Sequence, residues 1–158
     1  MKYKRIHPMN YASSANDITL FNNISGNLDN VDINSIDLQL SLLFEELTET
    51  IDGVETKNAV ELLDGAVDCY VIVVGLLEKL QQRGFKVEDA IDRITENNMS
   101  KFPKVKPENV QEGYTVAFVP EHDVYVVRNA AGKIMKPAGF QPVTLDDLVP
   151  QNVFGEKE

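Results

Sequence analysis

The sequence predicts an all-α protein, a bundle of four to five helices that carries a small C-terminal β-hairpin. Apolar residues recur at helical spacing over most of the chain from about residue 17 to residue 103. Alternation of Val and Tyr, which is typical of strands, begins only after Tyr114. The length of 158 residues, with 43% hydrophobic content, fits one globular domain with a moderate core.

The first helix is expected to be short. Residues 1–16 are polar and are expected to form an irregular leader. Asn16 or Asp17 can then cap a helix that runs through Phe21 and ends near Gly26, because Asn and Asp accept hydrogen bonds from the first free amides and Gly favours termination.

The second helix is expected to begin at a cap on Asn34 or Ser35 and to end at Asp52-Gly53. Its apolar residues recur three or four apart, which predicts one buried stripe facing the rest of the bundle. The residues of this stripe are Leu40, Leu43, Leu47 and Ile51.

The third helix is expected from about Asn58 to Gln82, before Gly84. Its middle, from Cys69 to Leu77, is apolar on every side, which indicates a place at the centre of the bundle or beneath another subunit. A fourth helix is expected to begin near Val87 and to end around residues 101–103.

The C-terminal part differs in kind. Two strand-like segments flank Pro120–Asp123 and predict a β-hairpin over residues 114–128, followed by irregular chain rich in Pro and Gly. The whole chain, 1–158, is therefore expected to be a single domain, with a helical core at about 17–103 and a hairpin and tail at about 104–158.

The charge balance restricts the partners. With 15 basic and 25 acidic residues the formal net charge is -10, which disfavours binding to a nucleic-acid polymer. A small polyanion remains acceptable if divalent cations neutralise both partners. The lone cysteine, Cys69, excludes an internal disulfide framework, and no apolar run is long enough for a signal peptide or a membrane span. The expected location is the cytoplasm.

Carboxylates lie beside the apolar stripes on two successive helices. Glu46 and Glu49 are three residues apart and share a face of the second helix. On the third helix Glu61, Asp64 and Asp68 follow at i, i+3 and i+7, and this row continues into apolar residues. If the two helices pack antiparallel, the two acidic rows face each other.

Facing carboxylates repel one another, so they need bound cations or shared protons. No Lys or Arg lies on either helical row. Ligation by oxygen atoms alone suits Mg²⁺ or Mn²⁺, which also bind phosphate oxygens. The alternative is that these acids are solvated faces of surface helices, since Glu is a good helix former. Spacing alone leaves the two interpretations equally open.

The acidic motifs resemble those of a known family. Glu45-Glu-x-x-Glu49 and Glu61-x-x-Asp64 are similar to the EExxE and ExxD signature of MazG-like nucleotide pyrophosphohydrolases. These enzymes belong to the all-α NTP pyrophosphatase superfamily, with dimeric dUTPases and phosphoribosyl-ATP pyrophosphohydrolase. Three further segments resemble the phage and bacterial branch in the same order: Asp64-Gly-Ala-Val-Asp68, Asn98-Met-Ser-Lys101 and Gly132-Lys-Ile-Met-Lys136.

The resemblance implies a Mg²⁺-dependent enzyme that cleaves a nucleoside triphosphate to the monophosphate and pyrophosphate. It also implies a homodimer or homotetramer. Glu45 would be an auxiliary carboxylate that orients water. The metal ligands implied are Glu46, Glu49, Glu61 and Asp64, and the substrate-binding residues implied are Asp68, Asn98, Lys101 and Lys136.

The chain also departs from the family pattern. The segment 114–128 interrupts the usual path after the fourth helix, and the residues before Asn98 lack the usual basic or Ser-containing lead. Base and sugar preference therefore stay open. A dUTPase-like or phosphoribosyl-ATP enzyme, and a catalytically silent helical oligomer that binds nucleotides or a partner, are the alternative functions.

Overall fold

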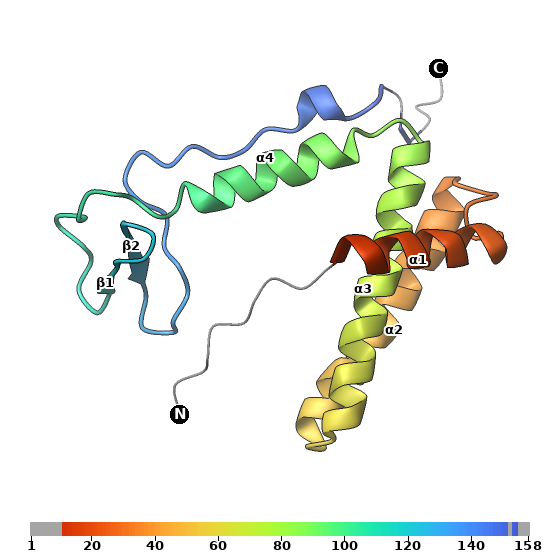
Figure 1. The fold of residues 1–158 in the computed structure, drawn as a ribbon, viewed down its shortest axis with the longest axis horizontal. Helices are drawn as coiled ribbons and strands as arrows, with labels where there is room; N and C mark the ends of the chain where they lie inside the picture. The colour runs from red at the N-terminus through yellow and green to blue at the C-terminus, as the bar shows by residue number, and fades with distance from the viewer. Residues whose placement is uncertain (1–10, 152, 155–158) are drawn as a thin grey trace. The chain divides into compact units, whose positions relative to one another are not determined.

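The computed structural model describes residues 11–151, 153 and 154. The chain divides into two compact units: one runs to Phe85 and takes in the C-terminal residues from Pro150, and the other spans Lys86–Val149. α-Helices dominate the described residues, and one antiparallel pair of strands accompanies them (Figure 1). The prediction of a mostly helical protein with a small hairpin is confirmed. The prediction of a single domain stays a prediction.

Helix α1 spans Tyr11–Ile24 and so begins earlier than the sequence predicts. Residues 11–16 are helical, and the expectation of an irregular leader is wrong for them; its first ten residues lie outside the described part. The extension is held by a tertiary contact, because the Tyr11 ring packs against Tyr70 with 5.6 Å between centroids. The Tyr70 hydroxyl also donates to the Tyr11 carbonyl at 3.4 Å.

Helix α2 spans Ile33–Glu55. Its N-cap is Asp32, whose Oδ1 accepts from the Ser35 amide at 2.8 Å, rather than Asn34 or Ser35. The helix continues past Gly53, where the sequence predicts its end. Gly53 is buried in the helix and serves close packing instead of termination.

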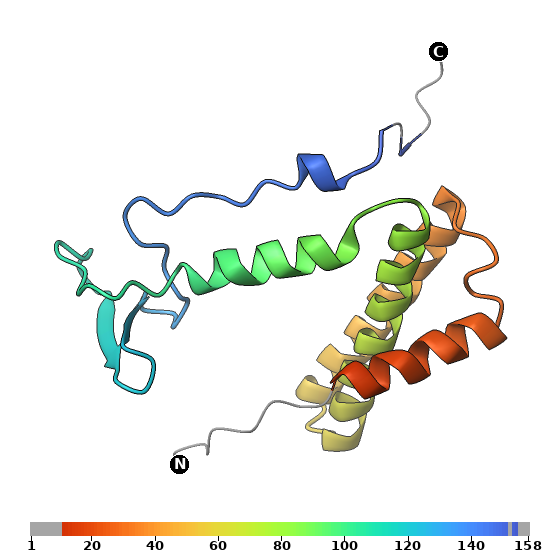
Figure 2. The same cartoon turned by 45° about the horizontal axis from the view of Figure 1, so that its top comes forward.

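Helix α3 spans Ala59–Gln82, as the sequence predicts. The Asn58 side chain caps it by accepting from the amides of Val60 and Glu61. Helices α2 and α3 lie side by side and antiparallel, and α1 crosses α3 (Figures 1 and 2). These three helices make up the described body of the first unit.

The predicted buried stripe of α2 is wrong for three of its four residues, since only Leu43 is half-buried. Leu40, Leu47 and Ile51 are 46–49% exposed. The positions that face α3 are instead shifted by about one residue along the helix, so that Gln39, Leu43 and Glu46 point inward. The sequence predicted that the stripe would be buried against the rest of the bundle, whereas Gln39, Glu46 and Gly53 occupy much of the side of α2 that faces α3.

The second unit contains helix α4 (Val87–Met99), strands β1 (Thr115–Val119) and β2 (Val124–Arg128), and a short 3-10 helix η1 (Asp146–Leu148). The strands pair antiparallel from Thr115↔Arg128 to Val119↔Val124, and Val127 is buried. No helix in the described part of the chain is both long and apolar enough to cross a bilayer.

Candidate functional site

Helices α2 and α3 meet along a seam of polar and small residues. On each helix the inward positions recur at alternating spacings of three and four, the repeat of helices that pack nearly parallel or antiparallel. On α2 the seam consists of Ile36, Gln39, Leu43, Glu46, Thr50 and Gly53. On α3 it consists of Glu61, Gly65, Asp68, Ile72, Gly75 and Lys79.

Glycines bring the two helices close together. A methyl group on Gly53 would lie 2.5 Å from the Leu62 amide nitrogen and 2.8 Å from its Cα. A methyl group on Gly65 would lie 2.7 Å from the Thr50 Oγ1 and 3.1 Å from the Glu46 carbonyl oxygen. The close approach places the carboxylates of one helix directly against the other helix.

The seam gathers carboxylates around Glu46. Burial raises the pKa of Glu46, and the neighbouring charges of Glu49, Asp68, Glu45 and Asp64 raise it further. Glu46 and Asp68 are half-buried, whereas the other three side chains are exposed. Five of the acids that the sequence singles out therefore lie together, and the other four repel the carboxylate of Glu46.

Glu61 is turned toward the start of its own helix. Its Oε2 accepts a hydrogen bond from the Asn58 side-chain Nδ2 at 3.0 Å. Over residues 11–151, 153 and 154, no group of three or more His, Cys, Asp or Glu side chains is arranged to hold a metal ion. The donors nevertheless have the right chemistry for Mg²⁺ or Mn²⁺, since both ions prefer carboxylate oxygens.

A pocket lined with carboxamides lies one heptad along the seam from these acids, on the side where α1 crosses. Asn22 and Gln39 are buried there. The Asn22 Nδ2 donates to Glu78 at 2.7 Å, the Asn27 Nδ2 donates to the Asn22 Oδ1 at 3.1 Å, and the Gln39 Nε2 donates to the Ile72 carbonyl at 2.9 Å. The pocket has a volume of about 330 Å³ and includes Phe21, Leu42 and Val71.

The sequence-based reasoning missed this pocket. One signal was available for Gln39, which lies seven residues before Glu46 and so shares its row on α2. For Asn22 and Asn27 no signal was available, because α1 and the following loop reach the seam only through tertiary packing.

Two cations near the end of α3 hold the connection between α1 and α2. Lys79 is 2% exposed, and its Nζ donates to the carbonyls of Asn27 and Asn30 and to the Ser35 hydroxyl. Burial lowers the pKa of Lys79, and Asp32 opposes that shift. Arg83 donates to the carbonyls of Val31 and Val153. The loop that carries Asn27 is therefore fixed beside the carboxamide pocket.

The predicted phosphate-binding residues Asn98, Lys101 and Lys136 belong to the second unit. The Lys101 Nζ donates to the Asn98 Oδ1 at 2.7 Å, so these two side chains pair with each other. The exposed Lys136 lies over the Phe140 ring, with its Nζ 5.0 Å from the centroid. Asn98 and Lys101 thus form a hydrogen-bonded pair, and Lys136 forms a cation–π contact with Phe140, all within this unit.

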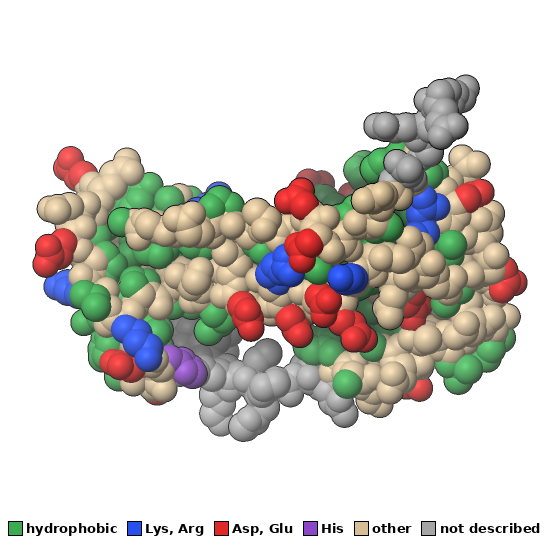
Figure 3. Space-filling model, turned by 90° about the horizontal axis from the view of Figure 1, so that it is seen from above, with side chains coloured by type: hydrophobic (Ala, Val, Ile, Leu, Met, Phe, Trp, Pro, Cys, Tyr) green, Lys and Arg blue, Asp and Glu red, His purple; other side chains and the backbone are tan. Residues whose placement is uncertain are grey.

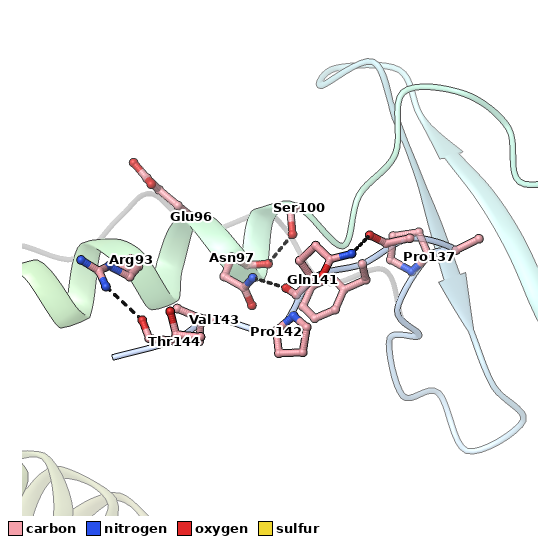
Figure 4. Close-up of a pocket in the computed structure, with 12 residues that line it drawn as sticks. Arg93, Glu96, Asn97, Ser100, Pro137, Gln141, Pro142, Val143 and Thr144 are labelled. Carbon is pink, nitrogen blue, oxygen red and sulfur yellow. Dashed lines mark hydrogen bonds between the residues drawn. The ribbon is translucent and has the colours of Figure 1, made fainter. Parts of the chain in front are cut away.

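A groove of about 560 Å³ separates α4 from the extended segment 137–144 (Figure 4). Arg93 donates to the Thr144 carbonyl at 3.0 Å and pairs with Asp147 at 2.6 Å. Asn97 donates to the Gln141 carbonyl at 2.8 Å. These bonds tie the extended segment along α4.

Comparison of the chain with protein-family models, with curated proteins and with solved structures gives no match.

Proposed function

We propose that the protein is a Mg²⁺-dependent nucleoside triphosphate pyrophosphohydrolase that releases the nucleoside monophosphate and pyrophosphate. The observation that carries the proposal is the group of carboxylates around Glu46 on the α2–α3 seam, in which each charged neighbour acting on Glu46 is also a carboxylate. A structural role would favour an apolar or paired side chain at a seam position, so this arrangement calls for a cation. The ordered motifs that resemble MazG-like enzymes support the same activity and the same helical fold.

In this proposal Glu46, Glu49, Glu61 and Asp64 hold Mg²⁺, with Mn²⁺ as a substitute. The ion would stabilise the charge of the leaving pyrophosphate and lower the pKa of bound water. Glu45 would orient the attacking water. Asp68 would contact sugar or phosphate, and the phosphate-binding roles of Asn98, Lys101 and Lys136 follow from the family resemblance.

The carboxamide pocket is the proposed site of the nucleoside. Leu42 lies seven residues before Glu49, and Val71 lies seven after Asp64, so the pocket is about 10 Å along the helices from the acids. Carboxamides form paired hydrogen bonds with base edges, and Phe21 adds an aromatic face at the rim. A base in the pocket would leave the phosphates near the carboxylates.

A nucleotide-binding protein without turnover is the second candidate. The observation that favours it is the hydrogen bond from the Asn58 side chain to Glu61, which engages one of the four proposed ligands at the N-terminus of its own helix. The two candidates differ in whether Mg²⁺ draws Glu61 into the group of acids.

The test is a panel of the eight common NTPs and dNTPs, extended to dUTP and phosphoribosyl-ATP, with Mg²⁺ or with EDTA. We expect Mg²⁺-dependent formation of monophosphate and pyrophosphate, and the fastest substrate identifies the preferred base and sugar. Formation of diphosphate and orthophosphate would contradict the proposed bond. Nucleotide binding without any product would support the second candidate.

Matched variants connect the activity to the site. Glu49→Gln removes one proposed ligand, whereas Asp52→Asn removes an exposed acid elsewhere on α2. We expect Glu49→Gln to lose turnover by about a hundredfold or more and Asp52→Asn to retain it. Equal activity of the two variants would show that the acids of the seam are not the catalytic centre.

A further inference from the structure

The three carboxamides that line the pocket of the first unit are joined in one hydrogen-bonded row. Asn27 lies between the other two, because its Nδ2 donates to the Asn22 Oδ1 at 3.1 Å and to the Gln39 Oε1 at 3.5 Å. The two outer side chains, Asn22 and Gln39, are only 3% and 4% exposed. The order of the row is therefore Asn22, Asn27, Gln39.

The partners of the two outer amides fix which of their atoms is the nitrogen. The Asn22 Nδ2 donates to the Glu78 carboxylate at 2.7 Å, and the Gln39 Nε2 donates to the Ile72 carbonyl at 2.9 Å. A carboxylate and a carbonyl accept hydrogen bonds, so a flipped amide would place two acceptors against each other. The donors of the row are thereby assigned.

Each amide keeps one hydrogen-bonding group that the described residues leave unused. An amide nitrogen carries two hydrogens, and Asn22 and Gln39 each donate one of them within the described part of the chain. Asn27 uses both of its hydrogens, whereas its Oδ1 accepts no bond from the described residues. The row therefore offers a donor, an acceptor and a donor, in that order.

Gly75 of α3 allows the three amides to come together. A methyl group on this buried glycine would lie 2.9 Å from the Gln39 Nε2, 3.2 Å from the Asn22 Nδ2 and 3.4 Å from the Asn27 Nδ2. The three nitrogens therefore gather around one point on α3, and a larger residue there would displace them. The three unused groups are close enough for a single small ring to contact all of them.

We propose that the carboxamide pocket selects a base whose edge presents a carbonyl, an N–H and a second carbonyl, as the pyrimidine-2,4-dione ring of uracil or thymine does. The inference rests on the proposed nucleoside site and adds the chemical class of the base. The two carbonyls of the ring accept from Asn22 and Gln39, and its N–H donates to the Asn27 Oδ1. Leu42 and Val71 of the pocket lining supply apolar surface for the faces of the ring.

The other bases leave part of the row unsatisfied. Cytosine and adenine present an amino group and a bare ring nitrogen where the dione presents a carbonyl and an N–H, so donor meets donor and acceptor meets acceptor. Guanine matches one donor and the acceptor, but its amino group then meets the second donor. Asn22 and Gln39 are buried, and a buried donor without a partner weakens binding. This penalty is the physical source of the selection.

Uncharged deoxynucleosides test the pocket without a metal ion or a reaction. Acidic side chains are prominent on the face shown in Figure 3, in keeping with 25 acidic and 15 basic residues, so a nucleotide without Mg²⁺ would be repelled whatever its base. The full chain in EDTA is titrated with deoxyuridine, thymidine, deoxycytidine, deoxyadenosine and deoxyguanosine, and binding is followed by NMR chemical shifts.

We expect deoxyuridine or thymidine to bind at least about tenfold more tightly than each of the other three deoxynucleosides. The tighter of the two shows whether the pocket accepts the 5-methyl group. A smaller preference, or no binding of either at millimolar concentration, would overturn the proposal. Selective binding without hydrolysis of any triphosphate would retain this inference and overturn the proposed reaction. Hydrolysis of triphosphates without this selectivity would do the reverse.

A methylated ligand and a pair of variants test the central contact. The N3-methyl derivative of the tighter ligand lacks the N–H, so the wild type should bind it at least about tenfold more weakly than the parent. Asn27→Ala should abolish this difference, whereas Asn23→Ala removes an exposed carboxamide outside the pocket and should keep it. The ratio of two affinities is insensitive to a general loss of structure. A ratio that persists in Asn27→Ala would contradict the assignment.

Gly75→Ala displaces the amides while favouring the helix. Ala is a better helix former than Gly, and the atoms that the methyl group would meet are the ends of side chains, which can move. We therefore expect a folded protein by circular dichroism that no longer prefers deoxyuridine or thymidine over the other deoxynucleosides. Full selectivity in Gly75→Ala would show that the row of amides does not select the base.

Discussion

Two demands conflict at Glu46. The residue occupies a seam position between α2 and α3, where close helix packing favours small or apolar side chains. Its carboxylate is nevertheless surrounded by Glu45, Glu49, Asp64 and Asp68, and burial and these charges raise its pKa. A side chain that costs stability at such a position is a candidate for function, because selection for folding alone would replace it.

Replacement of Glu46 by Gln is expected to separate stability from activity. Gln keeps the size of the side chain and removes the repulsion, so the metal-free melting temperature should rise by a few degrees while Mg²⁺-dependent turnover falls by about a hundredfold or more. Calorimetry in EDTA and the nucleotide assay measure the two effects. The same change at the exposed Asp52 should alter neither; a lower melting temperature for Glu46→Gln would show that the carboxylate stabilises the fold.

Replacement of Gln39 by Leu is expected to weaken substrate binding and, through loss of the buried hydrogen bond to the Ile72 carbonyl, to lower stability. The buried carboxamide would no longer reach a base edge, and the loss of one hydrogen bond of about 1.4 kcal/mol raises KM about tenfold with kcat unchanged. Steady-state kinetics on the preferred substrate measure the split. Gln111→Leu, an exposed carboxamide of the second unit, is the control. A fall in kcat with unchanged KM would place Gln39 outside the nucleoside site.

The acids and the amides differ in how far the sequence alone predicts them. The spacing of Glu46 and Glu49 and of Asp64 and Asp68 puts each pair on one helical face, and the structure brings the four together. Periodicity is a local property, so it reveals which residues of one helix share a face. The contact of Asn22 with Glu78 joins residues 56 apart in the chain, and only the packing of α1 on α3 creates it.

At the level of helices, the seam explains why Gly53 and Gly65 lie inside long helices. An isolated Gly in a helix costs about 1 kcal/mol relative to Ala. Gly53 and Gly65 accept that cost because a methyl group at either position would meet the backbone of the opposite helix within 3.1 Å. The same packing explains why α2 does not end at Gly53.

The sign of the stability change in Gly53→Ala therefore shows which of two effects is larger, helix propensity or close packing. Helix propensity alone would stabilise the variant by about 1 kcal/mol, whereas the contact with the backbone of Leu62 should destabilise it by about 1–3 kcal/mol. Chemical denaturation monitored by circular dichroism measures the difference. Ser41→Ala, at an exposed position of α2, should be neutral or slightly stabilising. A stabilised Gly53→Ala would mean that the helices are farther apart than the seam requires.

Helix α4 and the short helix η1 are joined by a pair that titrates. The hydrogen bond from Arg93 lowers the pKa of Asp147 below its ordinary value of 3.8. A lowered folded-state pKa gives stability that is present above the ordinary value and is lost as pH falls through the folded-state value. The stability difference between wild type and Asp147→Asn should therefore be constant from pH 5 to 7 and vanish in acid. The difference is expected to be small, since the pair is exposed.

Helix boundaries were predictable where the chain carries its own signals. Asn58 and Gly84 bracket α3, and the structure confirms its bounds. The early start of α1 depends on the packing of Tyr11 against Tyr70, which no local pattern indicates. The apolar stripe of α2 was recognised as a stripe but was wrongly expected to be buried, because periodicity does not say which surface covers a face.

At the scale of the whole molecule, charge and apolar surface are divided between opposite sides of the same helices. The acids border the seam on one side, and exposed apolar residues of α2, among them Leu40, Phe44 and Leu47, lie on the other. A net charge of -10 destabilises the folded chain through self-repulsion, and added salt screens part of it. Screening acts on all surface charges, whereas a bound cation acts at one place.

This difference allows specific cation binding to be measured without a substrate. We expect Mg²⁺ to raise the melting temperature more than NaCl of equal ionic strength, because an ion bound only by the folded state stabilises it by mass action. The excess should disappear in Glu49→Gln and persist in Asp52→Asn, since both variants lose one negative charge and only the first loses a proposed ligand. Equal effects of Mg²⁺ and NaCl on the melting temperature of the wild type would mean that salt only screens the carboxylates and that they bind no Mg²⁺. The basis for a metal-dependent reaction would then be lost. An excess that survives in Glu49→Gln would place the cation elsewhere on the chain.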